Sequence, residues 1–116
     1  MEFIEAPAFT KHLSEYMSDD IFMEFQRVLR FNPEAGDIMP GTGGFRKVRW
    51  PDLRRGKGKR GGLRVIYFYF PAEEQIWLLT IYGKDEAADL TPEQKRILKS
   101  SIEEEKRARS FRRRRI

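Results

Sequence analysis

The sequence contains no cysteine and a single histidine, His12. The absence of cysteine excludes disulfide frameworks, thiolate zinc sites and a cysteine nucleophile. One histidine cannot build a histidine-rich metal site, so we expect no metal and no cofactor. No run of about 18 consecutive apolar residues is present, and the segment after Met1 is acidic where a secretory signal would be basic and then apolar. These absences predict a soluble, cytoplasmic protein with no membrane partner.

Length and composition predict one compact domain. The chain has 116 residues, of which 40% are hydrophobic, which is enough for a single core. Charged residues make up 35% of the chain, against about 25% in an average domain. The formal net charge is +5, which favours polyanionic partners.

The positive charge is concentrated in two segments. Residues 46–64 carry nine Lys and Arg against Asp52 alone, and residues 103–116 carry seven against three Glu, while the rest of the chain is net acidic. An ordinary solvated surface would interleave the two signs, so the internal segment is a candidate binding surface. We expect a single domain over residues 1–109 and a basic, flexible tail over residues 110–116.

Hydrophobic spacing predicts two helices near the N-terminus. Apolar residues at i, i+4 and i+7 line one face of a helix over residues 8–17, with Pro7 in its first turn. Ser18 suits the N-cap of a second helix. That helix ends at Asn32, because the residue before Pro33 is disfavoured in the α region.

The middle of the chain has the pattern of β-strands. Residues 63–70 and 76–82 are rich in β-branched and aromatic side chains, and a five-residue connector joins them into a predicted antiparallel hairpin. Residues 45–50 are a third predicted strand and residues 1–4 a weaker one. Residues 36–44 are predicted to be a loop.

A third helix is predicted to follow Thr91. Thr91 suits the N-cap, Pro92 the first turn, and Gln94 completes a capping box. The residues expected on its buried stripe are Ile97, Leu98 and Ile102. The predicted fold is therefore α+β, with two N-terminal helices packed on a three- to four-stranded, mainly antiparallel sheet, plus a C-terminal helix, and with the helices covering one face of the sheet.

The internal basic segment contains a glycine-rich loop over residues 54–62, with four glycines and five cations. Glycine lets the backbone approach a phosphodiester chain, and Lys and Arg reach its phosphates. The start of the first hairpin strand lies beside the end of the second. We therefore expect Arg64, Tyr82 and Lys84 to converge beside this loop.

Cations and a tyrosine without a carboxylate pair favour metal-independent RNA cleavage. The substrate's own 2′-hydroxyl attacks the adjacent phosphate, so the protein supplies no nucleophile. Lys and Arg near the phosphate stabilise the developing charge, and removal of one such donor commonly costs about 10²–10³ in rate. A lysine crowded by other cations can have a lowered pKa and share the proton transfer.

The predicted site residues fall into two groups. The candidates for catalysis are Lys57, Lys59, Arg64, Tyr82 and Lys84. The candidates for RNA binding are Arg46, Lys47, Arg49, Arg54, Arg55, Arg60, Trp50 and Tyr67. Aromatic side chains can stack on unpaired bases, but Trp50 and Tyr67 also fit a role in the core or on the sheet surface.

Three motifs in order, Gly41–Arg49, Gly56–Tyr67 and Leu78–Lys84, resemble the HigB-type toxins of the RelE/ParE superfamily. The resemblance covers roughly residues 21–90. It implies the toxin of a type II toxin–antitoxin system, a ribosome-dependent mRNA endonuclease that halts translation. The implied partners are the ribosome, mRNA and a HigA-like helix-turn-helix antitoxin.

The resemblance also implies roles for single residues. Those that match family positions are Arg64, the loop lysines Lys57 and Lys59, and Lys84. RelE carries an arginine where this chain has Asp85, and its C-terminal catalytic tyrosine has no counterpart, so Tyr82 is the candidate substitute. Two other functions stay open: a non-catalytic module that binds RNA or the ribosome, and a ParE-like inhibitor of DNA gyrase.

Overall fold

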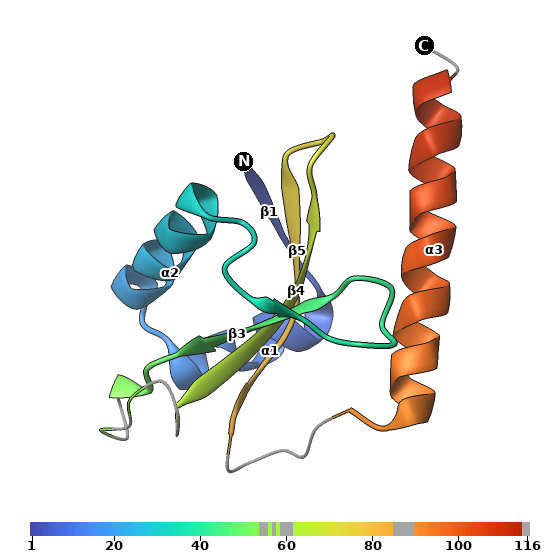
Figure 1. The fold of residues 1–116 in the computed structure, drawn as a ribbon. Helices are drawn as coiled ribbons and strands as arrows, with labels where there is room; N and C mark the ends of the chain where they lie inside the picture. The colour runs from blue at the N-terminus through green and yellow to red at the C-terminus, as the bar shows by residue number, and fades with distance from the viewer. Residues whose placement is uncertain (54–55, 57, 59–61, 85–89, 115–116) are drawn as a thin grey trace.

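The computed structural model describes residues 1–53, 56, 58, 62–84 and 90–114. Its elements are β1 (Glu2–Glu5), α1 (Pro7–Tyr16), α2 (Asp19–Phe31), β2 (Asp37–Ile38), β3 (Arg46–Trp50), β4 (Leu63–Phe70), β5 (Gln75–Gly83) and α3 (Pro92–Arg114). Figure 1 shows the sheet at the centre, with α2 and α3 on opposite sides of it. The predicted α+β class is confirmed. In the described part of the chain, no helix is long and apolar enough to cross a membrane.

The sheet has five strands, in the order β1-β5-β4-β3-β2, rather than the three or four expected. The predicted β4–β5 hairpin is confirmed. β1 pairs with β5 in parallel, and β2 pairs with β3 in the segment predicted as a loop. β2 is two residues long, too short to show a period of two, and the β1–β5 pairing joins segments about 70 residues apart, which local patterns do not specify.

The helices cover both faces of the sheet, which corrects the expectation that they cover one. α1 and α2 pack with Leu63, Val65 and Tyr67 of β4 in one core. The alternate β4 residues, such as Ile66 and Phe68, pack with Ile102 of α3 and its neighbours in a second core. β4 is apolar almost throughout because both of its faces are buried.

The predicted caps at Ser18 and Thr91 and the end of α2 at Asn32 are confirmed, and α1 starts and ends one residue before its predicted bounds. The Ser18 hydroxyl accepts a hydrogen bond from the Ile21 amide at 3.3 Å, which caps α2. The Gln94 amide donates to the Thr91 hydroxyl at 3.1 Å, and the Thr91 amide donates to the Gln94 side chain at 2.9 Å. This is the predicted capping box of α3. Ile102 is buried as expected, but Ile97 is 59% exposed, so its place on the buried stripe was wrong.

α3 continues through Arg114, so the expected boundary between residues 109 and 110 falls inside a helix. Glu105 accepts hydrogen bonds from Arg109 at 2.9 Å and from Arg112 at 3.3 Å. Glu73, in the β4–β5 connector, accepts from Arg113 at 2.6 Å. These acid–arginine pairs stabilise the last turns of the helix. They could not be predicted from the composition of the Arg-rich C-terminal segment alone.

The loop before β3 packs directly against α3. Gly43 has a φ of +80°, and a Cβ at that position would lie 2.8 Å from Ile102 Cγ2 and 3.3 Å from Lys99 Cα. Gly41 has the same φ of +80°, but a Cβ there would meet only the Lys95 side chain, at 3.9 Å. The two glycines therefore share the backbone conformation and differ in the space around them.

Replacing Gly43 with Ala should destabilise the protein more than replacing Gly41 with Ala. Both variants carry the left-handed backbone cost of about 1–2 kcal/mol, while G43A also overpacks the contact with α3, which costs about 1–3 kcal/mol more. The measurement is the free energy of unfolding in urea. Equal losses in the two variants would show that the loop does not pack on α3 as described.

Candidate active site

The structure aligns three predicted site residues in one row across the sheet. Arg49 of β3 lies opposite Arg64 of β4, and Arg64 lies opposite Tyr82 of β5. Directly opposed residues project from the same face with Cβ atoms about 4.5–5.5 Å apart. Tyr82 packs against the core beneath α3, so the Arg49–Arg64–Tyr82 row lies on the α3 side of the sheet. The Lys84 amide donates to the Gly62 carbonyl at 3.0 Å, which holds Lys84 at the same end.

A β-bulge sets this alignment. The register of β4 and β5 shifts between Ile66 and Tyr67. From Tyr67 to the end of β4 the register is set by the pairing of Tyr67 with Leu78. If the same register continued toward the start of β4, Ile81 would lie opposite Arg64. The extra residue in β5 places Tyr82 there instead. Bulges next to functional sites commonly re-aim a side chain in this way.

The three cations and the tyrosine of the site differ in exposure. Arg49 and Lys84 are exposed, Tyr82 is half-buried, and Arg64 is only 5% exposed. One Arg64 guanidinium nitrogen, Nη1, donates to the Leu63 carbonyl at 3.1 Å. Arg49 and Lys84 are therefore the groups placed to touch a ligand, whereas Arg64 supplies fixed positive charge behind them.

Two like charges lie directly opposite each other in this row, at Arg49 and Arg64. Such a pair is destabilising by itself. An anion bound beside the row would offset that repulsion. Local rules are most often broken at functional sites, so the pair marks this end of the sheet as a candidate anion site.

Asp52 is a residue of this region that the sequence analysis did not assign. It is the one acid in residues 46–64 and is 1% exposed. A side chain at Gly62 would collide with the backbone of Trp50 and Asp52, so Asp52 follows β3 closely beside the start of β4. A lone acid inside a basic segment is a signal that could have marked it as a residue worth locating in the fold.

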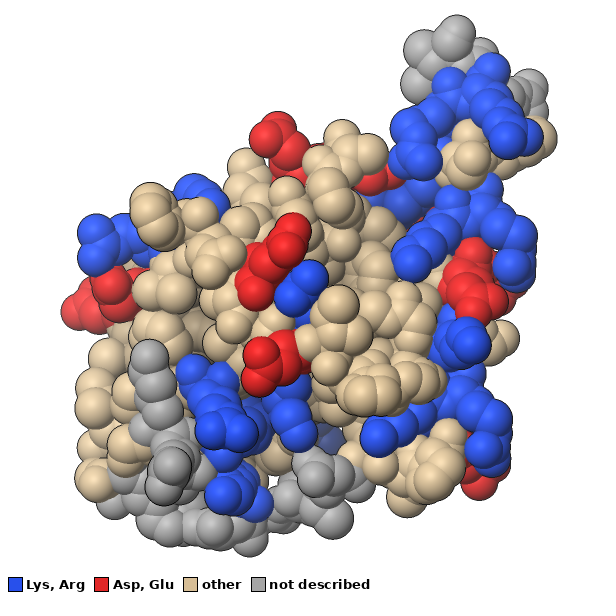
Figure 2. Space-filling model, viewed as in Figure 1, with Lys and Arg blue, Asp and Glu red and all other residues tan. Residues whose placement is uncertain are grey.

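The remaining cations of β3 divide between the two faces. Lys47 lies opposite Ile66 and projects from the same face as the row. Figure 2 shows Lys and Arg side chains gathered over β3 in the lower left of the molecule. Arg46 projects from the other face, where its Nη1 donates to the Gly36 carbonyl at 2.8 Å and its Nη2 lies 3.6 Å from a Glu34 carboxylate oxygen. Arg46 thus fastens the segment after α2 and does not join the row.

The two aromatic candidates for base stacking lie away from the row. Trp50 is half-buried, and its ring meets Phe25 of α2 edge-on, with ring centroids 5.1 Å apart. Tyr67 is completely buried, so no ring face is open to a base and the stacking assignment was wrong. Tyr67 occupies the α1–α2 face because the alternation of β4 places it beside Leu63 and Val65 in that core.

Tyr67 serves as a structural anchor. Its hydroxyl donates to the Pro33 carbonyl at 2.7 Å and accepts from the Gly36 amide at 2.9 Å. Burial raises the pKa of the Tyr67 phenol above its usual value, and the hydrogen bond from Gly36 opposes that rise in part. The hydroxyl therefore ties the segment between α2 and β2 to the centre of the sheet.

Five predicted site residues lie outside the described ranges. They are the candidates for catalysis Lys57 and Lys59 and the candidates for RNA binding Arg54, Arg55 and Arg60. Within the described ranges, no three His, Cys, Asp or Glu side chains are grouped so that they could hold a metal ion. Comparison with protein-family models finds none that matches this chain.

Replacing Tyr67 with Phe should lower the free energy of unfolding by about 1–3 kcal/mol, because it leaves the Gly36 amide and the Pro33 carbonyl without their buried partner. The measurement is urea denaturation at neutral pH. Tyr69→Phe is the matched control, since the Tyr69 hydroxyl makes no hydrogen bond to any described residue. A Y67F variant as stable as Y69F would contradict the anchoring role.

The stability difference between the wild type and Y67F should depend on pH. The folded pKa of Tyr67 is raised, so its contribution is fully present below the unfolded pKa of about 10 and is lost as pH rises through the folded pKa. Urea denaturation at pH 8 to 11 should show the difference shrinking at the alkaline end. A difference that stays constant would contradict a buried, neutral phenol.

Proposed function

We propose that this chain is the toxin of a type II toxin–antitoxin system and acts as a ribosome-dependent, metal-independent endoribonuclease. Its substrate is translated mRNA, and its action halts translation. The observation that supports this best is the Arg49–Arg64–Tyr82 row with Lys84 at the same end of the sheet. Three cations and one phenol thus lie together at one end of β3, β4 and β5. The basic glycine-rich loop joins β3 to β4 in the sequence.

The reaction needs no protein nucleophile. The 2′-hydroxyl oxygen of the substrate attacks the adjacent phosphorus, the bond from phosphorus to the 5′-oxygen breaks, and a 2′,3′-cyclic phosphate forms. A base must accept the proton of the 2′-hydroxyl and an acid must protonate the leaving 5′-oxygen. DNA lacks the 2′-hydroxyl and is not cleaved by this route.

The exposure of each side chain suggests its role. The exposed Lys84 and Arg49 contact the phosphate and its neighbours, and the buried Arg64 stabilises the negative charge that develops in the transition state. The half-buried Tyr82 hydroxyl is the candidate for proton transfer. Partners of this proposal are the ribosome, which presents the message, and a HigA-like antitoxin, which neutralises the toxin.

A non-catalytic module that binds RNA or the ribosome is the second candidate. The observation in its favour is the burial of Arg64, because a guanidinium that is 5% exposed and bonded to its own strand is poorly placed to contact a phosphate directly. In this case the exposed cations clamp phosphates without any bond being broken.

A cell-free translation reaction with the purified protein tests the proposal, with mRNA 5′ ends mapped by primer extension in the presence and absence of ribosomes. The wild type should produce new ends only on translated mRNA. Lys84→Ala should lower the cleavage rate by about 10²-fold. Arg64→Ala should lower it by a similar factor, with Arg64→Lys restoring part of the rate because it retains the charge.

Lys11→Ala is the matched control, because Lys11 is an exposed cation on α1, on the other face of the sheet. It should cleave at the wild-type rate. Translation arrest with intact mRNA would replace the nuclease with the binding module. No arrest, together with inhibition of DNA supercoiling, would instead identify a gyrase inhibitor.

A further inference from the structure

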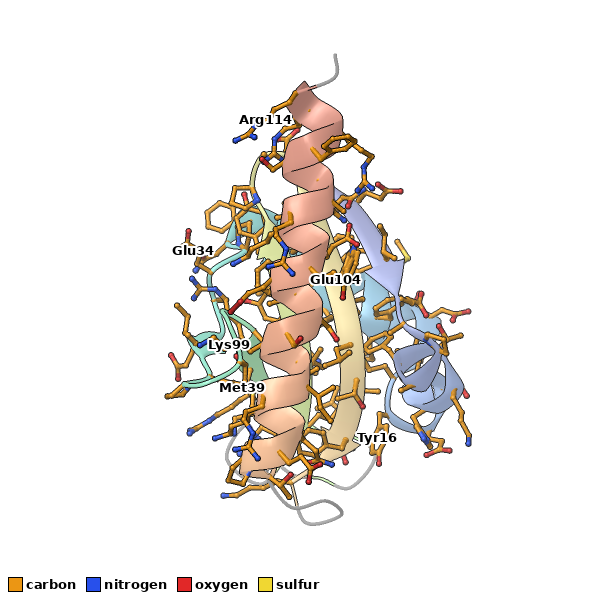
Figure 3. The ribbon with its side chains drawn as sticks, turned by 90° about the vertical axis from the view of Figure 1, so that its right-hand side faces the viewer. Tyr16, Glu34, Met39, Lys99, Glu104 and Arg114 are labelled. Carbon is orange, nitrogen blue, oxygen red and sulfur yellow. The ribbon has the colours of Figure 1, made fainter. Side chains whose placement is uncertain are left out.

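α3 separates its charges onto two sides. At about 3.6 residues per turn, seven cations fall on one side of the helix, with Glu103 as the one acid among them, and one of the seven, Arg113, pairs with Glu73. The other six residues, called the α3 basic face, are Lys95, Arg96, Lys99, Lys106, Arg107 and Arg114. Figure 3 looks directly at α3 and places Lys99 and Arg114 on one side of the helix and Glu104 toward the other.

The orientation of the helix is fixed, so this face stays outside. Ile102 of α3 is 1% exposed and packs into the core beneath the helix. Two turns further, Arg109 is buried, with its guanidinium 3.7 Å from the centroid of the Phe70 ring and its Nε 2.9 Å from a Glu105 oxygen. The Lys106 ammonium donates to the Gly43 carbonyl at 3.3 Å, so the edge of the basic face borders the loop before β3.

Most cations of the basic face form no ion pair within the described part of the chain. Among the described residues, Lys95, Arg96, Lys99, Arg107 and Arg114 form no ion pair, whereas the neighbouring Arg109, Arg112 and Arg113 pair with Glu73 and Glu105. Acidic side chains thus neutralise Arg109, Arg112 and Arg113, whereas five cations of the basic face form no ion pair with a described residue. Figure 2 shows Lys and Arg side chains along the whole length of α3, at the right of the molecule.

The shape and chemistry of this face fit a phosphodiester backbone. Lys95 and Arg114 are about 28 Å apart along the axis at about 1.5 Å per residue, which spans several nucleotides. No apolar side chain lies among the six cations, whereas protein interfaces are built around apolar or aromatic anchors. Membrane-surface helices present a continuous apolar face to lipid. In α3, Ile102 and Leu98 pack toward the sheet, and the exposed Ile97 and Phe111 are too far apart along the helix to form such a face.

We propose that the α3 basic face binds the phosphate backbone of folded RNA, as a surface separate from the Arg49–Arg64–Tyr82 row. The helix lies across the backbone, because the deep, narrow major groove of an RNA duplex does not admit side chains. Binding is independent of base sequence and falls with salt, since each phosphate contact releases a counterion. The choice of RNA as the polyanion rests on the proposed function, but binding requires neither a ribosome nor cleavage.

The test is fluorescence anisotropy of a labelled RNA hairpin of about two helical turns, titrated with the full chain at several KCl concentrations. The variant R96Q/K99Q/R107Q removes three exposed, unpaired cations of the basic face. The matched control K11Q/R27Q/R30Q removes three exposed cations from α1 and α2, on the other face of the sheet, and changes the net charge equally. Circular dichroism verifies that both variants retain their helices.

The basic-face variant should bind the hairpin at least about tenfold more weakly near 0.1 M salt, with a salt slope smaller by about 2–3. The control should bind like the wild type. Equal losses of hairpin affinity in the two variants, or no loss in the basic-face variant, would contradict the assignment of RNA binding to this face. Equal wild-type affinity for a DNA hairpin of the same length would overturn its assignment to RNA. If R96Q/K99Q/R107Q weakens hairpin binding while the wild type leaves translated mRNA intact, this surface stands and the proposed nuclease does not, so the two proposals fail separately.

Discussion

The alternation of side chains along β4 is the constraint on which the rest of the structure depends. β4 is the central strand of the five, and its residues enter two cores in turn, one beneath α1 and α2 and one beneath α3. A slip of one residue would exchange the two sets. Arg64 would then project into the α1–α2 core, and the Tyr67 hydroxyl would lose its hydrogen bonds to the segment after α2. Hydrophobic packing therefore fixes which face the candidate site occupies.

The same constraint explains why a buried arginine is tolerated beside two exposed cations. Arg64 is the one charged position in a strand that is otherwise apolar or aromatic, and it lies at the end of β4 where the bulge in β5 delivers Tyr82. Burial reduces the solvent screening of the guanidinium, so its charge would act more strongly on a phosphate bound beside it than the charge of a solvated lysine would. The fold thus combines a buried guanidinium at Arg64 with exposed cations at Arg49 and Lys84.

Features governed by neighbouring residues could be predicted from the sequence. The Ser18 and Thr91 caps, the end of α2 before Pro33 and the β4–β5 hairpin depend on contacts within a few residues or across one turn. The hairpin brings Arg64 and Tyr82 to the same end of the sheet, but the bulge that places them directly opposite each other was not predicted. The parallel β1–β5 pairing, the side of the sheet taken by α3 and the burial of Tyr67 depend on segments distant in sequence, and no local period encodes them.

The separation of the two basic surfaces has a physical consequence for how RNA would be handled. Exposed charges are screened over about 8–10 Å at physiological salt, so cations spread over the length of α3 cannot all act on a phosphate held at the Arg49–Arg64–Tyr82 row. In the proposed reaction, the α3 cations contribute affinity for RNA, and the row stabilises the charge at the reacting phosphate. An RNA that contacts α3 is held by many weak, salt-sensitive contacts, while the few groups at the end of β4 and β5 act on one bond. Binding and chemistry can therefore be impaired separately by substitution.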